Sequence, residues 1–293
     1  MTLEQLRIFV AVAEREHVTR ASQDLGLTQS AVSAAITALE RRYAIQLFDR
    51  IGRRIELTEA GRRFLRAARA VLAQAAAAET LLADLAGLKQ GALSLAASQT
   101  VANYWLPPLM HRFRRAYPGV ETTLTIGNTD TVAAMVHDGR VDLGFVEGAL
   151  DDPILDVLPV ADDELVLVAS PDLVGAKPPR PTAAALAALP WVFREKGSGT
   201  RAIFEAAAAD IGFDPAALQV ALTLPTNEAV RAAVEAGAGV AALSRLAVAK
   251  ALKAGTLAAF PLALPKRRFF AVRHRERHVS EAEREFMRLI DAA

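Results

Sequence analysis

A run of small polar side chains near the start of the chain has the chemistry to read another molecule. It lies in LGLTQSAVSAAITALE, residues 25–40, where Val32, Ile36 and Leu39 predict a helix with one apolar stripe. The outward positions of this helix, with its N-cap, are Thr28, Gln29, Ser30, Ser33, Ala34 and Thr37. Amides and hydroxyls on such a face reach base edges and phosphates, so the pattern favours a helix that lies in a DNA groove.

A second set of polar groups recurs in the C-terminal two thirds of the chain, where predicted strands pass into helices. Its members are Ser98, Gln99 and Thr100, then Asn128 and Thr129, then Ser198 and Thr200, then Thr226 and Asn227. Ligands of open parallel sheets bind beyond the carboxyl ends of the strands, where helix N-termini present free amides. Each group alone is the ordinary cap of a helix. Their recurrence at equivalent places indicates one shared polar cleft that suits an anion.

Glu147 does not fit a simple anion site. It follows the predicted strand of residues 143–146 and is expected to face the same cleft. A carboxylate beside an anion is unfavourable unless it is protonated or paired. Arg194, Lys196 and Arg201 are its candidate partners. Alternatively, the ligand carries its own proton or a cationic group.

Arginine is concentrated directly after the polar helix. Residues 41–69 contain nine arginines against three acidic residues. Arg50, Arg53 and Arg54 fall near the tip of a predicted two-stranded wing in LFDRIGRRIEL, where arginine contacts phosphates or the minor groove. The alternative is a solvated face with ordinary ion pairs. The position next to the polar helix favours contacts with phosphates.

The N-terminal pattern supplies the elements that would position the polar helix. Leu3, Leu6 and Phe9 mark a first amphipathic helix, and a short second helix covers about residues 19–25. A turn at Gly26 leads into the polar helix, as in a helix-turn-helix. Thr58 then caps a long, alanine-rich helix that runs to about residue 88. This helix packs either on its own domain or against its copy in a second chain. Its length and small side chains favour the second chain.

From Gly91 onward, apolar runs alternate with helical patterns. This alternation predicts an α/β fold with mostly parallel sheets covered on both faces. Two such lobes, joined near Ala161 and near Leu264, would enclose the polar cleft. The acidic run of Asp162, Asp163 and Glu164 is predicted as a solvated turn before a strand.

The composition narrows the class of protein. The chain has 293 residues and no cysteine, which excludes disulfides and thiolate metal sites. We expect a cytoplasmic protein, because the sequence shows neither a long uncharged apolar run nor an export signal. We expect no catalytic residues, no metal site and no cofactor. KGSGT has Lys196 before its glycines, unlike a P-loop, and His274 and His278 have no evident third metal ligand.

The order of the motifs along the whole chain resembles that of the LysR-type transcriptional regulators. TQSAVSAAITALE, LFDR, GRRIELTEAG and the long helix carry this resemblance. It implies a winged helix-turn-helix at residues 1–58, a linker and dimerisation helix at 59–89, and an effector-binding domain at 90–293 similar to periplasmic binding proteins. Lobe I would comprise about residues 90–161 and 265–293, and lobe II about residues 162–264.

The resemblance also implies partners. These are double-stranded promoter or operator DNA, a small-molecule effector, and the chain itself as a dimer or tetramer, with RNA polymerase as a further candidate. ASQTVANYWLPP, REKGSGTR and TNEAVRAAVEAGAGVAALS are similar to regulators of sulfur assimilation and of carbon fixation, which implies a small anionic effector. The chain departs from many members at Ala34, where they carry a basic residue. Base recognition would therefore depend more on Gln29.

Two other classes of protein remain as alternatives. One is a solute-binding protein that delivers its ligand to a transporter, and it is disfavoured by the N-terminal winged domain. The other is a two-lobed α/β enzyme that acts on a small anion. It is disfavoured because no acid, base and nucleophile are seen to converge.

Overall fold

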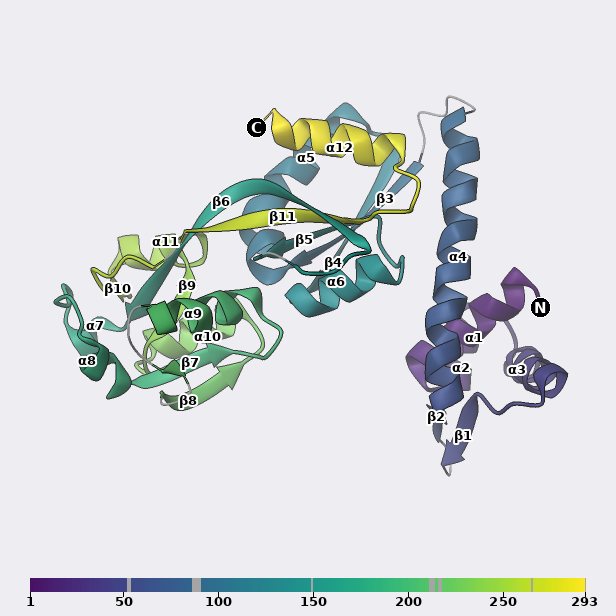
Figure 1. Cartoon of the computed structure of the whole chain (residues 1–293), viewed down its shortest axis with the longest axis horizontal. Coiled ribbons are helices and arrows are strands. Elements are labelled where there is room, and N and C mark those ends of the chain that lie inside the picture. The colour runs from purple at the N-terminus through teal and green to yellow at the C-terminus, as the bar shows by residue number, and fades with distance from the viewer. Residues whose placement is uncertain are drawn as a thin grey trace. The chain divides into compact units, whose positions relative to one another are not determined.

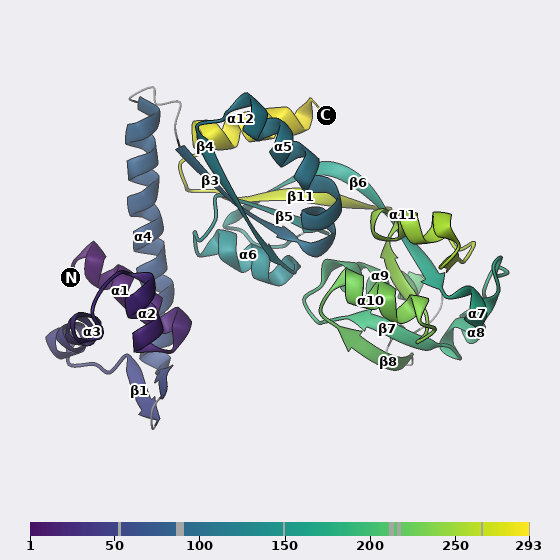
Figure 2. The same ribbon diagram turned by 180° about the vertical axis from the view of Figure 1, so that it is seen from behind.

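The computed structural model describes residues 1–51, 54–85, 91–148, 150–210, 214–215, 218–264 and 266–292. They form two compact units whose boundary in the sequence lies near residue 87 (Figures 1 and 2). Over the described residues, no helix has the length and apolar character needed to cross a membrane.

The N-terminal unit is a winged helix-turn-helix, as predicted. Its elements are α1 (Leu3–Arg15), α2 (Val18–Asp24), α3 (Gln29–Tyr43), β1 (Phe48–Ile51), β2 (Arg54–Leu57) and α4 (Glu59–Leu85). Thr28 Oγ1 accepts the amide of Ala31 at 3.2 Å and so caps α3, while Thr58 Oγ1 accepts the amide of Gly61 at 2.9 Å and caps α4. The apolar stripes of the helices meet around the buried ring of Phe9. The predicted end of the long helix near residue 88 lies outside the described residues.

Lobe I of the C-terminal unit is a sheet covered on both faces. In it, β3 (Gly91–Ser98) pairs in parallel with β4 (Val120–Gly127) and with β5 (Leu143–Glu147). One face packs against η1 (Val101–Trp105), α5 (Leu106–Ala116) and α12 (Glu281–Asp291), and the other against α6 (Thr129–His137). The helical stretch from Val101 to Ala116 therefore consists of two segments. The first of them, η1, is a π-helix.

Lobe II has its own core. Here β7 (Pro190–Arg194) pairs in parallel with β8 (Gln219–Leu224). Around them lie α7 (Pro171–Val174), α8 (Ala183–Ala187), α9 (Gly199–Asp210), α10 (Asn227–Glu235), β9 (Ala241–Ser244), α11 (Arg245–Ala254) and β10 (Ala258–Ala259). The rings of Trp191, Phe193 and Phe204 pack together at its centre.

Two long antiparallel strands, β6 (Leu155–Ala169) and β11 (Lys266–His274), run side by side from one lobe into the other (Figures 1 and 2). The prediction of a solvated turn at residues 162–164 is wrong, because these residues lie inside β6. Asp162, Asp163 and Glu164 stand opposite Arg268, Arg267 and Lys266 of β11. Opposite charges on facing residues stabilise an antiparallel pair, and this explains why an acidic run occurs within a strand.

Candidate functional site

The outward face of α3 is open to a partner. Thr28, Gln29, Ser30 and Thr37 are exposed, and Ser33 is half-buried. Thr19 Oγ1 of α2 donates to Gln29 Oε1 at 3.3 Å, which orients the amide group at the start of the helix. The predicted residues of α3 are thus brought together on one exposed surface.

The wing is tied to α3 by a residue that sequence analysis missed. Glu40 Oε1 accepts the amides of Leu47 at 2.8 Å and Phe48 at 3.3 Å, where the chain enters β1. Arg50 lies in β1 and Arg54 in β2, which form the antiparallel wing. Arg53 lies outside the described residues. Glu40 therefore fixes the start of the wing relative to the recognition helix.

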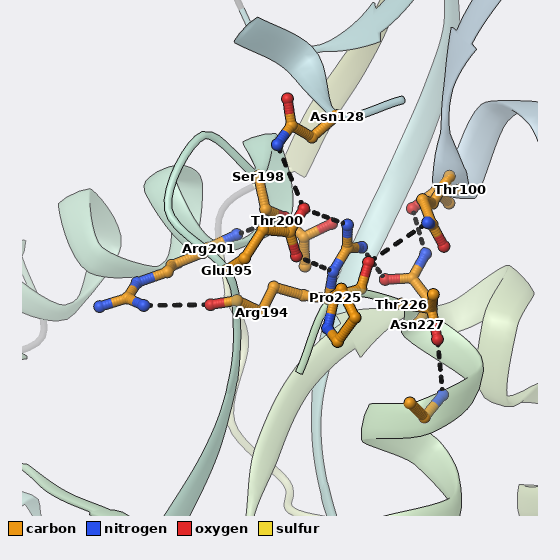
Figure 3. A network of polar contacts seen from close by, with 12 residues as sticks. Thr100, Asn128, Arg194, Glu195, Ser198, Thr200, Arg201, Pro225, Thr226 and Asn227 are labelled. Carbon is orange, nitrogen blue, oxygen red and sulfur yellow. Dashed lines mark hydrogen bonds and ion pairs between the residues drawn. The ribbon is translucent and has the colours of Figure 1, made fainter. Parts of the chain in front are cut away.

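The second candidate site lies in the C-terminal unit, where the lobes meet (Figure 3). Seven of the predicted cleft residues are buried, namely Ser98, Thr100, Thr129, Glu147, Ser198, Thr200 and Asn227. Gln99 and Asn128 are partly exposed. The capping alternative also holds for some positions, since Asn128, Ser198 and Thr226 accept amides in the first turns of α6, α9 and α10. The predicted groups do converge, from both lobes.

The side chain that joins them, Arg267 of β11, was not predicted. Its Nε donates to Asp163 Oδ2 at 2.6 Å, its Nη1 donates to Thr200 Oγ1 at 2.9 Å, and its Nη2 lies 3.5 Å from Thr100 Oγ1. Only 4% of Arg267 is exposed, so Asp163 balances a cation that is withdrawn from water. Arg267 thereby connects the crossover strands to lobe I through Thr100 and to lobe II through Thr200.

A second arginine bridges the lobes through neighbours. Arg194 Nη1 donates to Asn227 Oδ1 at 2.6 Å, and Asn227 Nδ2 donates to Thr100 Oγ1 at 3.0 Å. Arg194 also forms a two-pronged ion pair with Glu195, to which Asn128 of lobe I donates at 3.3 Å (Figure 3). Burial opposes ionisation of Glu195, but the bonds from Arg194 outweigh it and hold the pKa of Glu195 below its ordinary value.

Glu147 is buried, with 3% of the residue exposed. Its ion-pair partner is Arg267, whose Nη2 lies 3.9 Å from Glu147 Oε1. The predicted partners are wrong for two arginines, because Arg194 pairs with Glu195 and Arg201 pairs with Glu205. Glu147 therefore has a long contact to a cation that Asp163 already holds, and its Oε2 accepts from Thr129 Oγ1 at 3.5 Å.

Two further features occur where the lobes meet. Ser98 Oγ is buried at the carboxyl end of β3 and has no hydrogen-bond partner in the described part of the chain. Gly199, the first residue of α9, approaches lobe I so closely that an added Cβ would lie 2.5 Å from Thr129 Oγ1. The Ser98 hydroxyl is therefore available to form a hydrogen bond. Glycine at position 199 lets the backbone of lobe II come close to lobe I.

An exposed polar helix face and a buried polar network where two lobes meet are the features of a DNA-binding regulator with a ligand-binding domain. The model of the LysR substrate binding domain matches residues 86–293, and the model of the bacterial regulatory helix-turn-helix protein of the lysR family matches residues 3–62. The chain belongs to the LysR family of DNA-binding transcriptional regulators.

The chain aligns with known transcriptional regulators over most of their length. An uncharacterised HTH-type transcriptional regulator of Escherichia coli K12, YeiE, is 39% identical over 295 residues, covering 100% of this chain and 98% of that protein. The RuBisCO operon transcriptional regulator of Allochromatium vinosum is 34% identical over 244 residues, covering 83% and 80%.

Solved structures agree with the fold. The LysR family regulator CbnR has a TM-score of 0.71 at 22% identity, covering 100% of this chain and 99% of that one. The regulatory domain of CcmR from Synechocystis PCC6803, solved in complex with 2-PG, has a TM-score of 0.62 at 27% identity and covers 69% and 97%. The two-lobed architecture is therefore that of LysR regulators.

Proposed function

We propose that this regulator binds a small oxyanion between its lobes and that the bound anion changes how the protein acts on its DNA. The observation that carries the proposal is the buried guanidinium of Arg267. Asp163 holds it at Nε, so that Nη1 and Nη2 reach Thr200 and Thr100 on opposite lobes. A fixed guanidinium among hydroxyls suits an oxyanion. The complex of CcmR with 2-PG gives independent support.

The charges of the cleft narrow the effector further. Two guanidiniums, Arg194 and Arg267, face three carboxylates, Glu147, Asp163 and Glu195. A ligand with full negative charge beside Glu147 would be repelled. An oxyanion that keeps a proton or a hydroxyl can instead donate to Glu147 while its other oxygens accept from Arg267. We therefore expect a protonated or hydroxylated anion.

The effector would act by holding the lobes together, because its contacts would come from both of them. Such a shift requires that the anion bind the closed arrangement more tightly than the open one. We infer that two copies pair through α4, where Val71, Leu81 and Leu82 are exposed apolar residues. In a dimer or tetramer, closure of the lobes would alter how two α3 helices are presented to operator DNA.

We further infer that the protein is no enzyme, acts in the cytoplasm and uses no cofactor beyond its effector. The support is the family, whose members regulate transcription. RNA polymerase stays a predicted partner.

A thermal-shift screen with small anions tests the proposal, with sulfite, sulfate, phosphoglycolate and aromatic carboxylates as probes. Ligand at a hundred times its Kd stabilises the folded state by roughly 2.7 kcal/mol, enough to raise the melting temperature measurably. The shift should vanish in Arg267→Met. If no anion raises the melting temperature, or if Arg267→Met shifts as the unaltered chain does, the effector binds elsewhere.

A further inference from the structure

Asn103 and Tyr104 of lobe I reach lobe II at the edge of the cleft. Asn103 Nδ2 donates to Glu228 Oε1 at 3.1 Å, and Tyr104 Oη donates to the same oxygen at 2.8 Å. Glu228 lies in the first turn of α10, directly after Asn227, which bonds Thr100 inside the cleft. The two lobes are thus joined by contacts that run from a buried pair to a partly exposed one.

The local backbone explains how two consecutive residues meet one acceptor. Asn103 and Tyr104 belong to η1, a π-helical turn with Val101 and Ala102 buried in lobe I. In an α-helix, consecutive side chains point about 100° apart. A π turn is wider, so consecutive side chains diverge less, and such turns are frequent at functional sites. The π-helix therefore directs both side chains toward lobe II.

The contact is stronger than an ordinary surface hydrogen bond. Glu228 is a carboxylate that accepts from two donors, and hydrogen bonds to a charged acceptor are roughly twice as strong as neutral ones. Burial and the bond to Glu228 raise the pKa of Tyr104 to about 12, so its hydroxyl stays a donor across the physiological range. Asn103 is exposed and Glu228 is half-buried. Water therefore competes for part of the contact.

We propose that Asn103, Tyr104 and Glu228 form a latch that sets the ratio of closed to open lobes. None of the three is among the buried residues around Arg267. A change in the latch therefore alters closure without altering the groups that would hold an anion. If the anion binds only closed lobes, its apparent Kd equals the intrinsic Kd divided by the closed fraction. Only this last consequence rests on the proposed function.

The chain offers a matched control. Tyr117 Oη donates to Glu285 Oε2 at 2.7 Å, and both residues belong to lobe I. Tyr117→Phe removes the same kind of hydroxyl-carboxylate bond as Tyr104→Phe, but within one lobe. Any general effect of losing such a bond on stability appears in both variants, while an effect on closure appears only in Tyr104→Phe.

Hydrogen exchange of the Asp130 amide, followed in the full chain without any added anion, tests the latch. This amide, in the first turn of α6, donates across the lobes to Gly197 O at 3.4 Å, so its protection reports on closure. We expect exchange to become about ten- to hundredfold faster in Tyr104→Phe, as for the loss of one hydrogen bond to a charged group. It should become faster by a smaller factor in Glu228→Gln, where the amide oxygen still accepts but carries no charge. Tyr117→Phe should exchange like the unaltered chain.

Disulfide formation between two introduced cysteines gives a second test, which works even if the lobes close too weakly to protect this amide. The chain has no cysteine, so Asn128→Cys with Glu195→Cys places one thiol on each lobe at another contact. Intrachain cross-linking should then slow in Tyr104→Phe by the same factor. The latch is refuted if both readouts are unchanged by Tyr104→Phe and Glu228→Gln, or if Tyr117→Phe changes them equally. Failure of the anion screen would reject the proposed effector site and leave this result untouched.

Discussion

The outward face of α3 and the cleft between the lobes use the same hydroxyl and amide groups in opposite surroundings. On α3, Gln29 and Ser30 are exposed, and their contacts come from nearby residues such as Thr19 and Thr28. In the cleft, Thr100 and Thr200 are buried and bond Arg267, which lies far along the chain. Exposed groups keep their hydrogen-bonding capacity for a partner from solution. Buried groups are committed to one another, so a change at one must affect the others.

The largest effect expected from this difference is at Arg267. Arg267→Met leaves Asp163 buried without its cation, with Glu147 in the same cleft. Breaking a buried ion pair costs about 3–5 kcal/mol. Denaturant unfolding of the full chain, followed by the fluorescence of Trp105 and Trp191 in the C-terminal unit, measures this loss.

A matched exposed pair joins the next residue of β6 to the start of α11. Arg245 pairs with Glu164, the residue after Asp163, and about half of each side chain is exposed. Arg245→Met should cost less than about 1 kcal/mol, because water screens and replaces an exposed pair. Equal losses in the two variants would mean that Arg267 is no more than a surface ion pair.

The difference between local and long-range contacts explains which functional residues could be predicted from the sequence. Thr28, Asn128, Ser198 and Thr226 were found because a cap acts within one turn of its own helix. Arg267 was missed because its partners are 104, 67 and 167 residues away. One signal was present, since the acidic run at residues 162–164 matches the basic run at 266–268 in antiparallel order. The register of β6 and β11 was needed to recognise it.

The buried carboxyl of Glu283 should make the stability of the protein depend on pH. Glu283 of α12 is 4% exposed, and its Oε1 has no hydrogen-bond partner in the described part of the chain. Burial is the largest cause that raises its pKa, Arg273 opposes it and Asp142 adds to it, and the resulting pKa is about 7. The unfolded chain has a pKa near 4.5 at this residue, so it loses its proton first. The stability that protonated Glu283 contributes is full below pH 4.5 and is lost as the pH rises through 7.

Glu283→Gln should remove that loss, since glutamine stays neutral. The difference in free energy of unfolding between the variant and the unaltered chain should shift in favour of the variant by up to about 3 kcal/mol from pH 4 to pH 8. Unfolding curves between pH 4 and 8 measure the change, with exposed Glu121→Gln on β4 as the control. A pH dependence shared by all three proteins would place the titration at another group.

A substitution at Ser98 should distinguish an effect on effector binding from an effect on stability. Ser98→Ala removes a buried hydroxyl that bonds nothing in the described residues, so the free energy of unfolding should barely change. If the hydroxyl donates to a charged effector, calorimetric affinity for an anion found in the screen should weaken by about 1.5–3 kcal/mol. Thr200→Ala should instead lose both stability and affinity, because it removes a partner of Arg267. Unchanged affinity in Ser98→Ala would place the anion away from the end of β3.

Gln29 supplies the test on the exposed side of the comparison. Gln29→Ala should leave the fold intact, because the side chain is exposed and, among the described residues, its side-chain hydrogen bond is the one that it accepts from Thr19. Binding to the operator should weaken by roughly 1–3 kcal/mol, the discrimination that one good amide-base contact provides. Binding to unrelated DNA should not weaken, and the dependence on salt should keep its slope, because no cation that meets a phosphate has been removed. Titrations against operator and unrelated DNA at several salt concentrations separate these terms. Equal weakening on both DNAs would make Gln29 a contact to the backbone and move base reading to Ser33 or Thr37.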